Sequence, residues 1–207
     1  GSANGPSVLG TANVLMAATL ARGTTVIENA ACEPEVTDLC DALVAMGAKI
    51  SGQGSPMLTI EGVDELHGAE HRVIPDRIEA GTYVLAGALT GGQVRVEGCE
   101  PGHLGALLDR MREARVPFTV GEDWIETEAN DLNERPPRST DVTTHAYPGF
   151  PTDLQAQWMA LMTRADGLSI ITERIFSDRW MHVPELERLG APVRRQNTAV
   201  VVRGTRE

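Results

Sequence analysis

The chain has 207 residues, a length typical of one ordinary domain or two small ones. It carries 18 Lys and Arg against 29 Asp and Glu, and its formal net charge of −11 argues against non-specific binding to nucleic acid, which needs a basic surface. No apolar run approaches the roughly 20 residues that span a bilayer, and the N-terminus lacks the pattern of a secretory signal, so we expect no membrane association.

The first third of the chain predicts two helices and three strands. Its elements, in chain order, are a helix over 11–21, a strand over 24–28, a helix that ends at Gly47, and strands over 48–51 and 57–61. The helix that ends at Gly47 places Val36, Leu39 and Leu43 on one face, which is the spacing of an amphipathic helix.

The rest of the chain predicts the same order of elements twice more. The second segment has a strand over 71–74, a helix over 78–89, a strand over 93–97, a helix around 104–111, and strands over 117–120 and 124–127. The third segment has a strand over 141–144, a helix over 153–163, a strand over 168–172, a helix that starts near Val183 or Pro184, and strands near Val193 and over 198–202.

Residues that end helices recur at a nearly constant interval. The first helices of the three segments end 69 and 75 positions apart, at Gly23, Gly92 and Gly167. The second helices end 68 and 75 positions apart, at Gly47, Arg115 and Gly190. This period predicts an α/β (α+β) fold of three strand–helix–strand–helix–strand–strand units, the first without its leading strand. We place the first unit at 1–74 and the other two at 75–207, with a break near 130–138 between them.

The segment 149–157 contains Asp153, the strongest candidate for chemistry. Thr152 followed three residues later by Gln155 has the form of a capping box, and an acidic residue in the first turn favours the helix dipole. A carboxylate at a helix start that faces a cleft can instead act as a general base toward a substrate hydroxyl. The sequence leaves both interpretations open.

Three other helix starts carry polar residues. Asp76 has the position of an N-cap, and the neighbouring Arg77 and Glu79 predict a solvent-exposed pair. Ser7 precedes the first helix, where backbone N–H groups can bind an anion. Residues 33–35 predict an acidic cluster that complements the start of a helix.

The loop 173–182 brings Arg174, Arg179 and His182 between a strand and a helix. Such a loop can bind a carboxylate or phosphate through forked arginine bonds; the alternative is a local pair of Asp178 with Arg179. The other four histidines and the three cysteines lack metal-ligand spacing, so we expect no metal, cofactor or disulfide. An odd number of cysteines fits a reducing cytoplasm.

These segments together resemble the UDP-N-acetylglucosamine enolpyruvyl transferases, or 1-carboxyvinyltransferases. The stretches that carry the resemblance are 17–21, 27–31, 33–35, 47–54, 75–79, 150–157 and 181–186. It implies an inverse α/β barrel fold, with two domains of three units each around a deep cleft. It also implies transfer of enolpyruvate from phosphoenolpyruvate to the 3′-hydroxyl of UDP-N-acetylglucosamine, the first committed step of peptidoglycan synthesis and thus of cell-wall biogenesis, cell shape and division.

The resemblance assigns roles to seven residues. Asp153 matches the aspartate that holds and deprotonates the sugar hydroxyl. The other matches are nucleotide contacts at Ser7 and Val8, a substrate contact at Ile175, a basic position on the phosphoenolpyruvate side at Arg179, and acidic positions near the cleft and the hinge at Asp76 and Glu33.

The resemblance runs from Ser7 to Gly204 and covers about half of a usual family member. It implies the last unit of one domain and the first two of the other, without the family's phosphoenolpyruvate-binding lysine, Pro-Gly-Gly-Cys-type loop and C-terminal arginine. We therefore expect very low turnover from the chain alone, and a homodimer would restore six units. Two alternatives stay open: a catalytically silent three-unit scaffold or binding domain, and a 5-enolpyruvylshikimate-3-phosphate synthase-like transferase.

Overall fold

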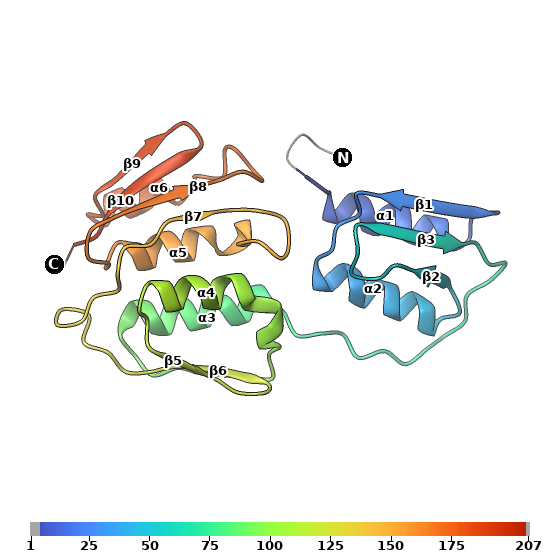
Figure 1. Cartoon of the computed structure of the whole chain (residues 1–207), viewed down its shortest axis with the longest axis horizontal. Coiled ribbons are helices and arrows are strands. Elements are labelled where there is room, and N and C mark those ends of the chain that lie inside the picture. Colours follow the sequence, from blue (N-terminus) through green and yellow to red (C-terminus); the bar gives the residue numbers. More distant parts are fainter. Residues whose placement is uncertain (1–4, 206–207) are drawn as a thin grey trace. The chain divides into compact units, whose positions relative to one another are not determined.

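The computed structural model describes residues 5–205, and in it the chain forms two compact units (Figure 1). The first unit contains the described residues up to Ile74 together with the short segment Ala146–Pro148. The second contains Pro75–His145 and the described residues from Gly149 onward. Each unit has a buried core of its own. Within residues 5–205 no helix combines the length and the apolar character needed to cross a membrane.

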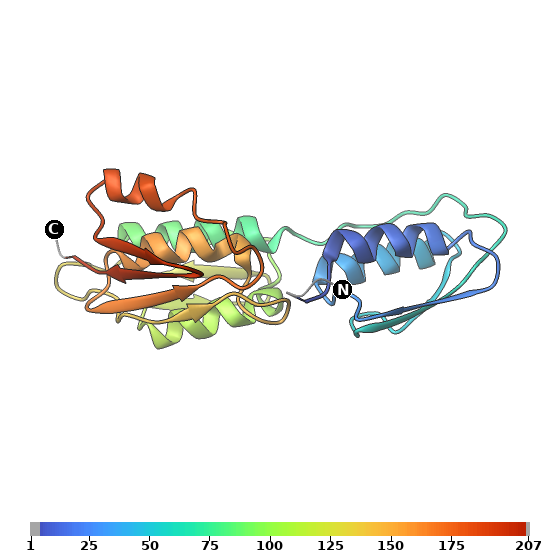
Figure 2. The same ribbon diagram turned by 90° about the horizontal axis from the view of Figure 1, so that it is seen from above.

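The first unit is a three-stranded antiparallel sheet with two helices on one face (Figure 2). Its elements are α1 (Val8–Ala18), β1 (Thr24–Glu28), α2 (Pro34–Ala45), β2 (Lys49–Ser51) and β3 (Met57–Glu61), and the sheet order is β1-β3-β2. α2 begins with proline at its first helical position, where the missing N–H has no partner to lose. Leu15, Cys40 and Ile60 lie at the centre of the core between helices and sheet.

The second unit contains the other two repeats. Its elements are α3 (Arg77–Thr90), β4 (Arg95–Glu97), η1 (Pro101–Leu104), α4 (Gly105–Glu113), β5 (Phe118–Val120), β6 (Trp124–Thr127), β7 (Val142–Thr143), η2 (Thr152–Leu154), α5 (Gln155–Met162), β8 (Leu168–Thr172), α6 (Val183–Arg188), β9 (Val193–Gln196) and β10 (Ala199–Arg203). The strands form two sheets of order β4-β6-β5 and β7-β8-β10-β9, antiparallel except for the β7–β8 pair.

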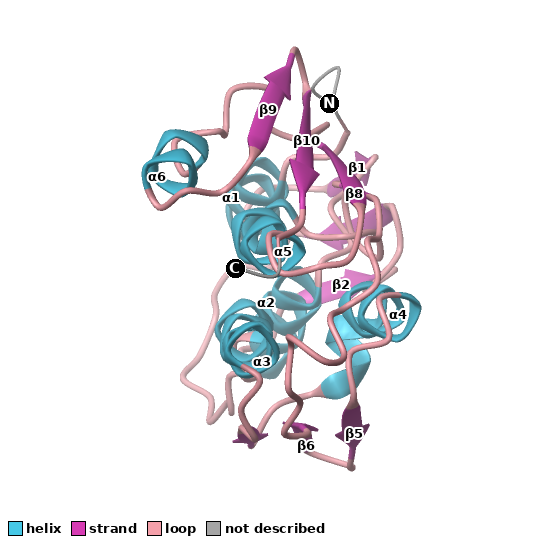
Figure 3. Ribbon diagram, turned by 90° about the vertical axis from the view of Figure 1, so that its left-hand side faces the viewer, coloured by secondary structure: helices cyan, strands magenta, loops and turns pink. Residues whose placement is uncertain are grey.

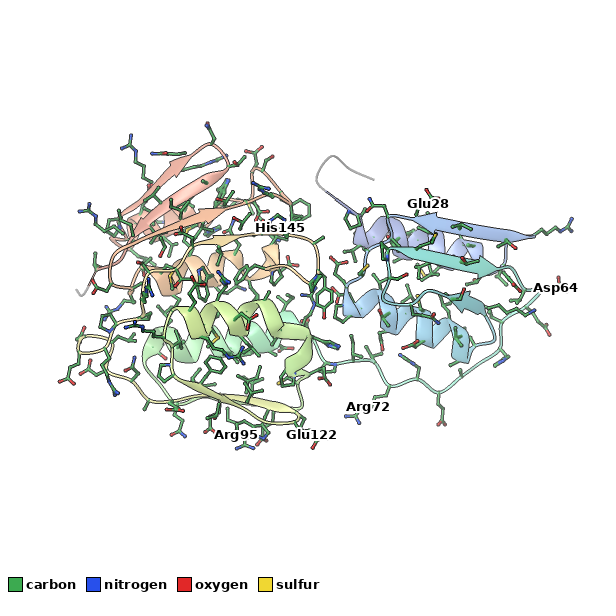
Figure 4. The ribbon with its side chains drawn as sticks, in the orientation of Figure 1. Glu28, Asp64, Arg72, Arg95, Glu122 and His145 are labelled. Atoms are coloured by element: carbon green, nitrogen blue, oxygen red, sulfur yellow. The ribbon has the colours of Figure 1, made fainter. Side chains whose placement is uncertain are left out.

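Helices fill the space between these two sheets. Figure 3 looks along α3 and α5 and shows them one above the other between the sheets. Trp158 on α5 is fully buried there and makes a T-shaped contact with Phe150 at a centroid distance of 5.7 Å. Figure 4 places Arg95 and Glu122 on the outer side of the β4-β6-β5 sheet, where the Arg95 guanidinium stacks 3.8 Å from the Trp124 ring. Each sheet of this unit thus has one face on the helices.

The predicted repeat is confirmed by a turn that recurs at the end of each second helix. Gly47, Arg115 and Gly190 all have a positive φ, of 101°, 58° and 91°. In each case the N–H of the next residue bonds to a carbonyl five residues back: Ala48 to Leu43, Val116 to Met111, and Ala191 to Leu186. This is the hydrogen-bond pattern of a Schellman motif. At the end of α3, where the sequence predicts a stop at Gly91 and Gly92, the positive φ falls on Gly91.

The prediction of a strand over 71–74 is wrong, because this segment is irregular in the structure. A strand needs a neighbouring edge to pair its backbone groups, and no described strand pairs with these residues. The third repeat is the one that shows the full predicted order within residues 5–205, as β7, α5, β8, α6, β9 and β10.

Candidate functional site

Asp153 and Arg179 form an ion pair in the second unit. Asp153 lies on η2, the 3₁₀ turn that leads into α5, and Arg179 lies on the loop between β8 and α6. The Arg179 Nη1 donates to Asp153 Oδ1 at 2.6 Å. The side chains are 40% and 48% exposed for Arg179 and Asp153, so a ligand can reach both groups from solvent.

The capping-box interpretation of Thr152 and Gln155 is wrong. The Thr152 hydroxyl donates to Glu173 Oε2 at 2.8 Å, and the Gln155 side-chain amide donates to the same oxygen at 3.3 Å. Neither side chain caps η2 or α5. Both side chains donate to an ionised acceptor here, and such hydrogen bonds are stronger than the neutral ones that a capping box accepts from backbone N–H groups.

The alternative of a local Asp178–Arg179 pair is also wrong. Asp178 Oδ1 accepts from Arg195 Nη2 at 2.9 Å, while Arg179 pairs with Asp153. Asp178 lies in a turn, so its side chain and that of the next residue leave the backbone in different directions. The loop therefore presents one arginine to Asp153.

The Asp153–Arg179 pair is not what holds the fold together. A partly exposed ion pair of this kind contributes about 0 to 1 kcal/mol, because water screens it and two long side chains lose freedom. The Arg179 guanidinium also lies 5.6 Å from the Phe176 ring.

Burial, and then the positive charge of Arg179, lower the pKa of the nearby His182. This histidine is therefore mostly neutral near pH 7.

Glu173 is the residue of this site that the sequence interpretation missed. It follows β8, is 1% exposed, and accepts hydrogen bonds from two threonine hydroxyls and two backbone N–H groups. Burial alone would raise the pKa of Glu173, but these hydrogen bonds outweigh it and leave the pKa lowered. A signal was available, since the inward positions Ser169 and Ile171 of β8 continue by alternation to residue 173.

Ile175 belongs to the same loop as Arg179. Its backbone N–H donates to Glu173 Oε1 at 2.7 Å, and its side chain is half-buried. Of the seven predicted site residues, the structure thus brings Asp153 and Arg179 into direct contact and joins Ile175 to them through Glu173.

Asp76 caps α3, as predicted. Its Oδ1 accepts from the backbone N–H groups of Ile78 at 2.7 Å and Glu79 at 3.0 Å. It also lines a pocket of about 280 Å³ together with Glu97 and Cys99. Asp153, Ile175 and Arg179 do not line this pocket, so Asp76 lies in a separate, acidic environment of the second unit.

The remaining three predicted site residues belong to the first unit. Ser7 caps α1 through a bond from the Gly10 N–H to its hydroxyl at 3.1 Å, and Val8 is the first helical residue. The predicted acidic cluster at a helix start is confirmed, since Glu33 is the N-cap residue of α2 and Glu35 lies in its first turn, although the Glu33 side chain makes no capping bond. It is buried, with Oε1 accepting from the Tyr147 N–H at 3.3 Å and Oε2 unpartnered among the described residues.

The cysteines give no sign of an activated nucleophile. All three are free, and burial raises the pKa of each, in the case of Cys40 to about 11. They are therefore thiols at neutral pH. Residues 5–205 contain no group of three or more His, Cys, Asp or Glu side chains placed to hold a metal ion.

Comparison with known structures and families defines the class of protein to which this chain belongs. The chain is similar to the crystal structure of the enolpyruvyl transferase NikO from Streptomyces tendae, with a TM-score of 0.88 and 27% identity over 97% of this chain and 47% of that one. The chain belongs to the EPSP synthase (3-phosphoshikimate 1-carboxyvinyltransferase) family, whose sequence profile matches residues 2–206.

Two curated relatives are more similar in sequence. The UDP-N-acetylglucosamine 1-carboxyvinyltransferase of Koribacter versatilis is 52% identical over 198 residues, which are 96% of this chain and 45% of that protein. The protein of the same name from Rhodopseudomonas palustris is 56% identical over 187 residues, 90% of this chain and 43% of that protein. The family resemblance predicted from the sequence is confirmed, and the chain spans about half the length of these relatives.

Proposed function

We propose that this chain is the part of an enolpyruvyl transferase that holds and deprotonates the sugar substrate. The reaction transfers enolpyruvate from phosphoenolpyruvate to the 3′-hydroxyl of UDP-N-acetylglucosamine and releases phosphate. The observation that carries the proposal is the exposed Asp153 carboxylate at the start of α5, with the Arg179 guanidinium 2.6 Å away. The names of the relatives at 52% and 56% identity support this choice of substrates.

In the proposed reaction Asp153 accepts the proton of the sugar hydroxyl. The sugar oxygen adds to C2 of phosphoenolpyruvate as C3 takes up a proton. Loss of a proton from C3 then re-forms the double bond as the bond from C2 to the phosphate oxygen breaks. General-base catalysis of this kind needs the carboxylate within hydrogen-bond reach of the hydroxyl. Arg179 supplies positive charge for the carboxylate or phosphate of phosphoenolpyruvate. Because the two groups pair in the free chain, substrate binding has to re-aim at least one of them.

The other predicted site residues take roles around this pair. Ser7 and Val8 contact the uridine nucleotide, which suits their place at the N-terminus of α1. Ile175 contacts the substrate from the loop that carries Arg179. Asp76 and Glu33 serve as acidic positions near the cleft and the hinge, and the buried Glu33 Oε2, which has no partner within residues 5–205, is consistent with a bond made in another state.

We also propose the setting in which the protein works. The reaction is the first committed step of peptidoglycan synthesis, which places the protein in cell-wall biogenesis and, through it, in cell shape and division. The proposed location is the cytoplasm, with no cofactor and no membrane partner, and the net charge of −11 supports the absence of a nucleic-acid partner. The proposed domains are residues 1–74, which contain one repeat, and residues 75–207, which contain two. A homodimer would bring six repeats together.

The test places the chain, unchanged, in the context of a full-length relative. Residues 7–204 are spliced into the Koribacter versatilis relative in place of its matching segment, and phosphate release from phosphoenolpyruvate is measured with UDP-N-acetylglucosamine as acceptor. The unspliced relative and the chain alone are assayed in parallel. We expect phosphate release from the spliced protein and very little from the chain alone.

The acceptor separates the alternatives. Shikimate 3-phosphate is offered in place of the sugar nucleotide, because the family is described by that acceptor. Phosphate release with shikimate 3-phosphate as acceptor, but not with UDP-N-acetylglucosamine, would favour the shikimate-type alternative. A spliced protein that is folded but inactive with both acceptors would favour the silent scaffold.

A further inference from the structure

Glu173 is a buried carboxylate with five hydrogen-bond donors around it. Its Oε1 accepts from the Thr144 hydroxyl at 2.6 Å and from the N–H groups of Ile175 at 2.7 Å and Phe176 at 3.0 Å. Its Oε2 accepts from Thr152 and Gln155 at 2.8 and 3.3 Å. All five partners donate, so the site suits an acceptor-only group, which is an ionised carboxylate.

Two of the donors, the hydroxyls of Thr144 and Thr152, also accept hydrogen bonds from arginines of the loop. The Thr144 hydroxyl donates its proton to Glu173 and accepts from the backbone N–H of Arg174 at 2.9 Å. The Thr152 hydroxyl likewise donates to Glu173 and accepts from Arg179 Nη1 at 3.3 Å. A hydroxyl has a single proton, so its commitment to Glu173 leaves only lone pairs to accept from the Arg174 backbone N–H at Thr144 and from the Arg179 guanidinium at Thr152.

We propose that Glu173 is a positioning residue for the transfer reaction. Its charge folds the segment 174–179 back onto the start of α5 and, through the Thr152 hydroxyl, holds the Arg179 guanidinium beside Asp153. Glu173 is too deeply buried to touch a substrate, so it acts through Arg179. The inference rests on the proposed function, because in that function the position of Arg179 determines where positive charge is supplied to phosphoenolpyruvate.

The geometry separates this role from simple support of the core. The inward neighbours of Glu173 along β8 are Ser169 and Ile171, and burying a charge after them is costly unless hydrogen bonds compensate. The loop backbone is supported by the bonds from Ile175 and Phe176 and by the Gln155 amide, which donates to Glu173 Oε2 at 3.3 Å and to the Arg179 carbonyl at 3.4 Å. The Thr152 link adds nothing to the loop backbone and reaches Arg179, which gives the positioning role a separate readout.

The first arm of the experiment uses the free chain and nuclear magnetic resonance. Hydrogen exchange is measured at the Ile175 and Phe176 amides, and the guanidinium signals of Arg179 report whether its Nη groups are held. In Glu173→Gln the side-chain NH₂ group faces partners that are themselves donors, so it cannot accept their hydrogen bonds. We therefore expect these amides to exchange roughly tenfold to a hundredfold faster, and the separate Arg179 guanidinium signals to merge into an averaged signal. Glu185→Gln is the matched control, because Glu185 is exposed and pairs with Arg188 on α6.

The second arm changes the link and keeps the carboxylate. Thr152→Val is expected to release Arg179 while the Ile175 and Phe176 amides stay protected, and Thr152→Ser is expected to keep both native. In the spliced protein Thr152→Val should lower kcat roughly tenfold to a hundredfold, since a misplaced group near the reacting atoms has effects of that size. Thr152→Ser should restore the rate. This arm remains decisive if Glu173→Gln fails to fold.

The outcomes distinguish this inference from the proposed function. Arg179 signals that stay native in Thr152→Val would overturn the positioning role, whatever the activity. An active spliced protein whose kcat is the same with valine and serine at position 152 would overturn it as well. A spliced protein without activity, together with released Arg179 signals in Thr152→Val, would refute the transfer function and leave the hydrogen-bond relay standing.

Discussion

The two units of this chain bury their helices to very different degrees. In the first unit a single repeat covers one face of its sheet, and α1 leaves Leu9 75% exposed and Val14 49% exposed. In the second unit two repeats share a core, so that α3 and α5 lie against each other and Trp158 is fully buried. A repeat of this kind therefore completes its sheet by itself, but it needs another repeat to cover its helices.

The difference also concerns the chemistry. The Asp153–Arg179 pair lies on a 3₁₀ turn and a loop that are attached to the larger core, with Leu154 and Trp180 buried on either side. A site whose supporting side chains are locked by packing keeps its geometry better than one on an isolated element. We therefore expect the second unit to be the more stable and to keep its site when the first unit unfolds.

The largest expected effect comes from the centre of each core. Trp158→Ala should destabilise the second unit by about 3 to 5 kcal/mol, and Leu15→Ala should destabilise the first by about 2 to 5 kcal/mol. All three tryptophans, Trp124, Trp158 and Trp180, lie in the second unit, so tryptophan fluorescence during denaturant unfolding follows that unit. The amide signal of Ile60 reports on the unfolding of the first unit. A fluorescence transition that moves equally in both variants would mean that the units unfold as one.

A medium effect is expected where α3 approaches η2 most closely. A Cβ added at Gly81 would lie 2.7 Å from Leu154 Cδ1 and 3.2 Å from Leu107, so Gly81→Ala should destabilise the second unit by about 1 to 3 kcal/mol. Gly105→Ala is the control on α4, because its Cβ meets open space and should stabilise that helix by about 0.5 to 1 kcal/mol. Equal shifts in the fluorescence midpoint for the two variants would contradict the close packing of α3.

Smaller effects are expected from the two helix caps. Ser7→Ala removes the cap of α1 and Asp76→Ala that of α3, and each should lower the stability of its own unit by about 1 kcal/mol. Denaturant midpoints are read from the Ile60 amide for the first unit and from fluorescence for the second. Ser7→Asp should retain the α1 cap. A loss of second-unit stability in Ser7→Ala would show that the units are coupled.

The smallest effect is a pH dependence confined to the second unit. The pKa of His182 is lowered from 6.5, so its unfolded form binds protons more readily, and stability should fall as the pH drops from about 6.5 through the folded-state pKa. The pKa of Glu173 is lowered as well, so its contribution is complete above about 4.5 and is lost as the pH falls through its folded value. His182→Asn should flatten the first of these slopes in fluorescence-monitored unfolding. His145→Asn, an exposed histidine of the same unit, should leave it unchanged.

Features set by near neighbours in sequence could be predicted, and features set by distant partners could not. The cap at Asp76 was predicted correctly because its donors, Ile78 and Glu79, lie two and three residues away. The recurring turn at Arg115 was located from repeat spacing alone. The segment 71–74 has strand-forming residues, but a strand depends on a pairing edge elsewhere in the chain, and the structure provides none among the described strands.

The candidate site shows the same limit more sharply. Thr152 and Gln155 have the spacing of a capping box, yet their partner is Glu173, which is 21 and 18 residues away. The Asp153–Arg179 contact spans 26 residues and could be expected only from the family resemblance. Alternation along β8 does predict that residue 173 faces inward, so a buried charge at that position is a usable signal for a site.

The most direct test of the central claim is the turnover of Asp153→Asn in the spliced protein. Asparagine keeps the shape of the side chain and its contact distance to Arg179, but it cannot accept the proton of the sugar hydroxyl. We predict that kcat for phosphate release with UDP-N-acetylglucosamine falls by roughly 10²- to 10⁴-fold while KM for the sugar nucleotide changes little. A kcat that Asp153→Asn leaves unchanged would contradict the assignment of Asp153 as the base.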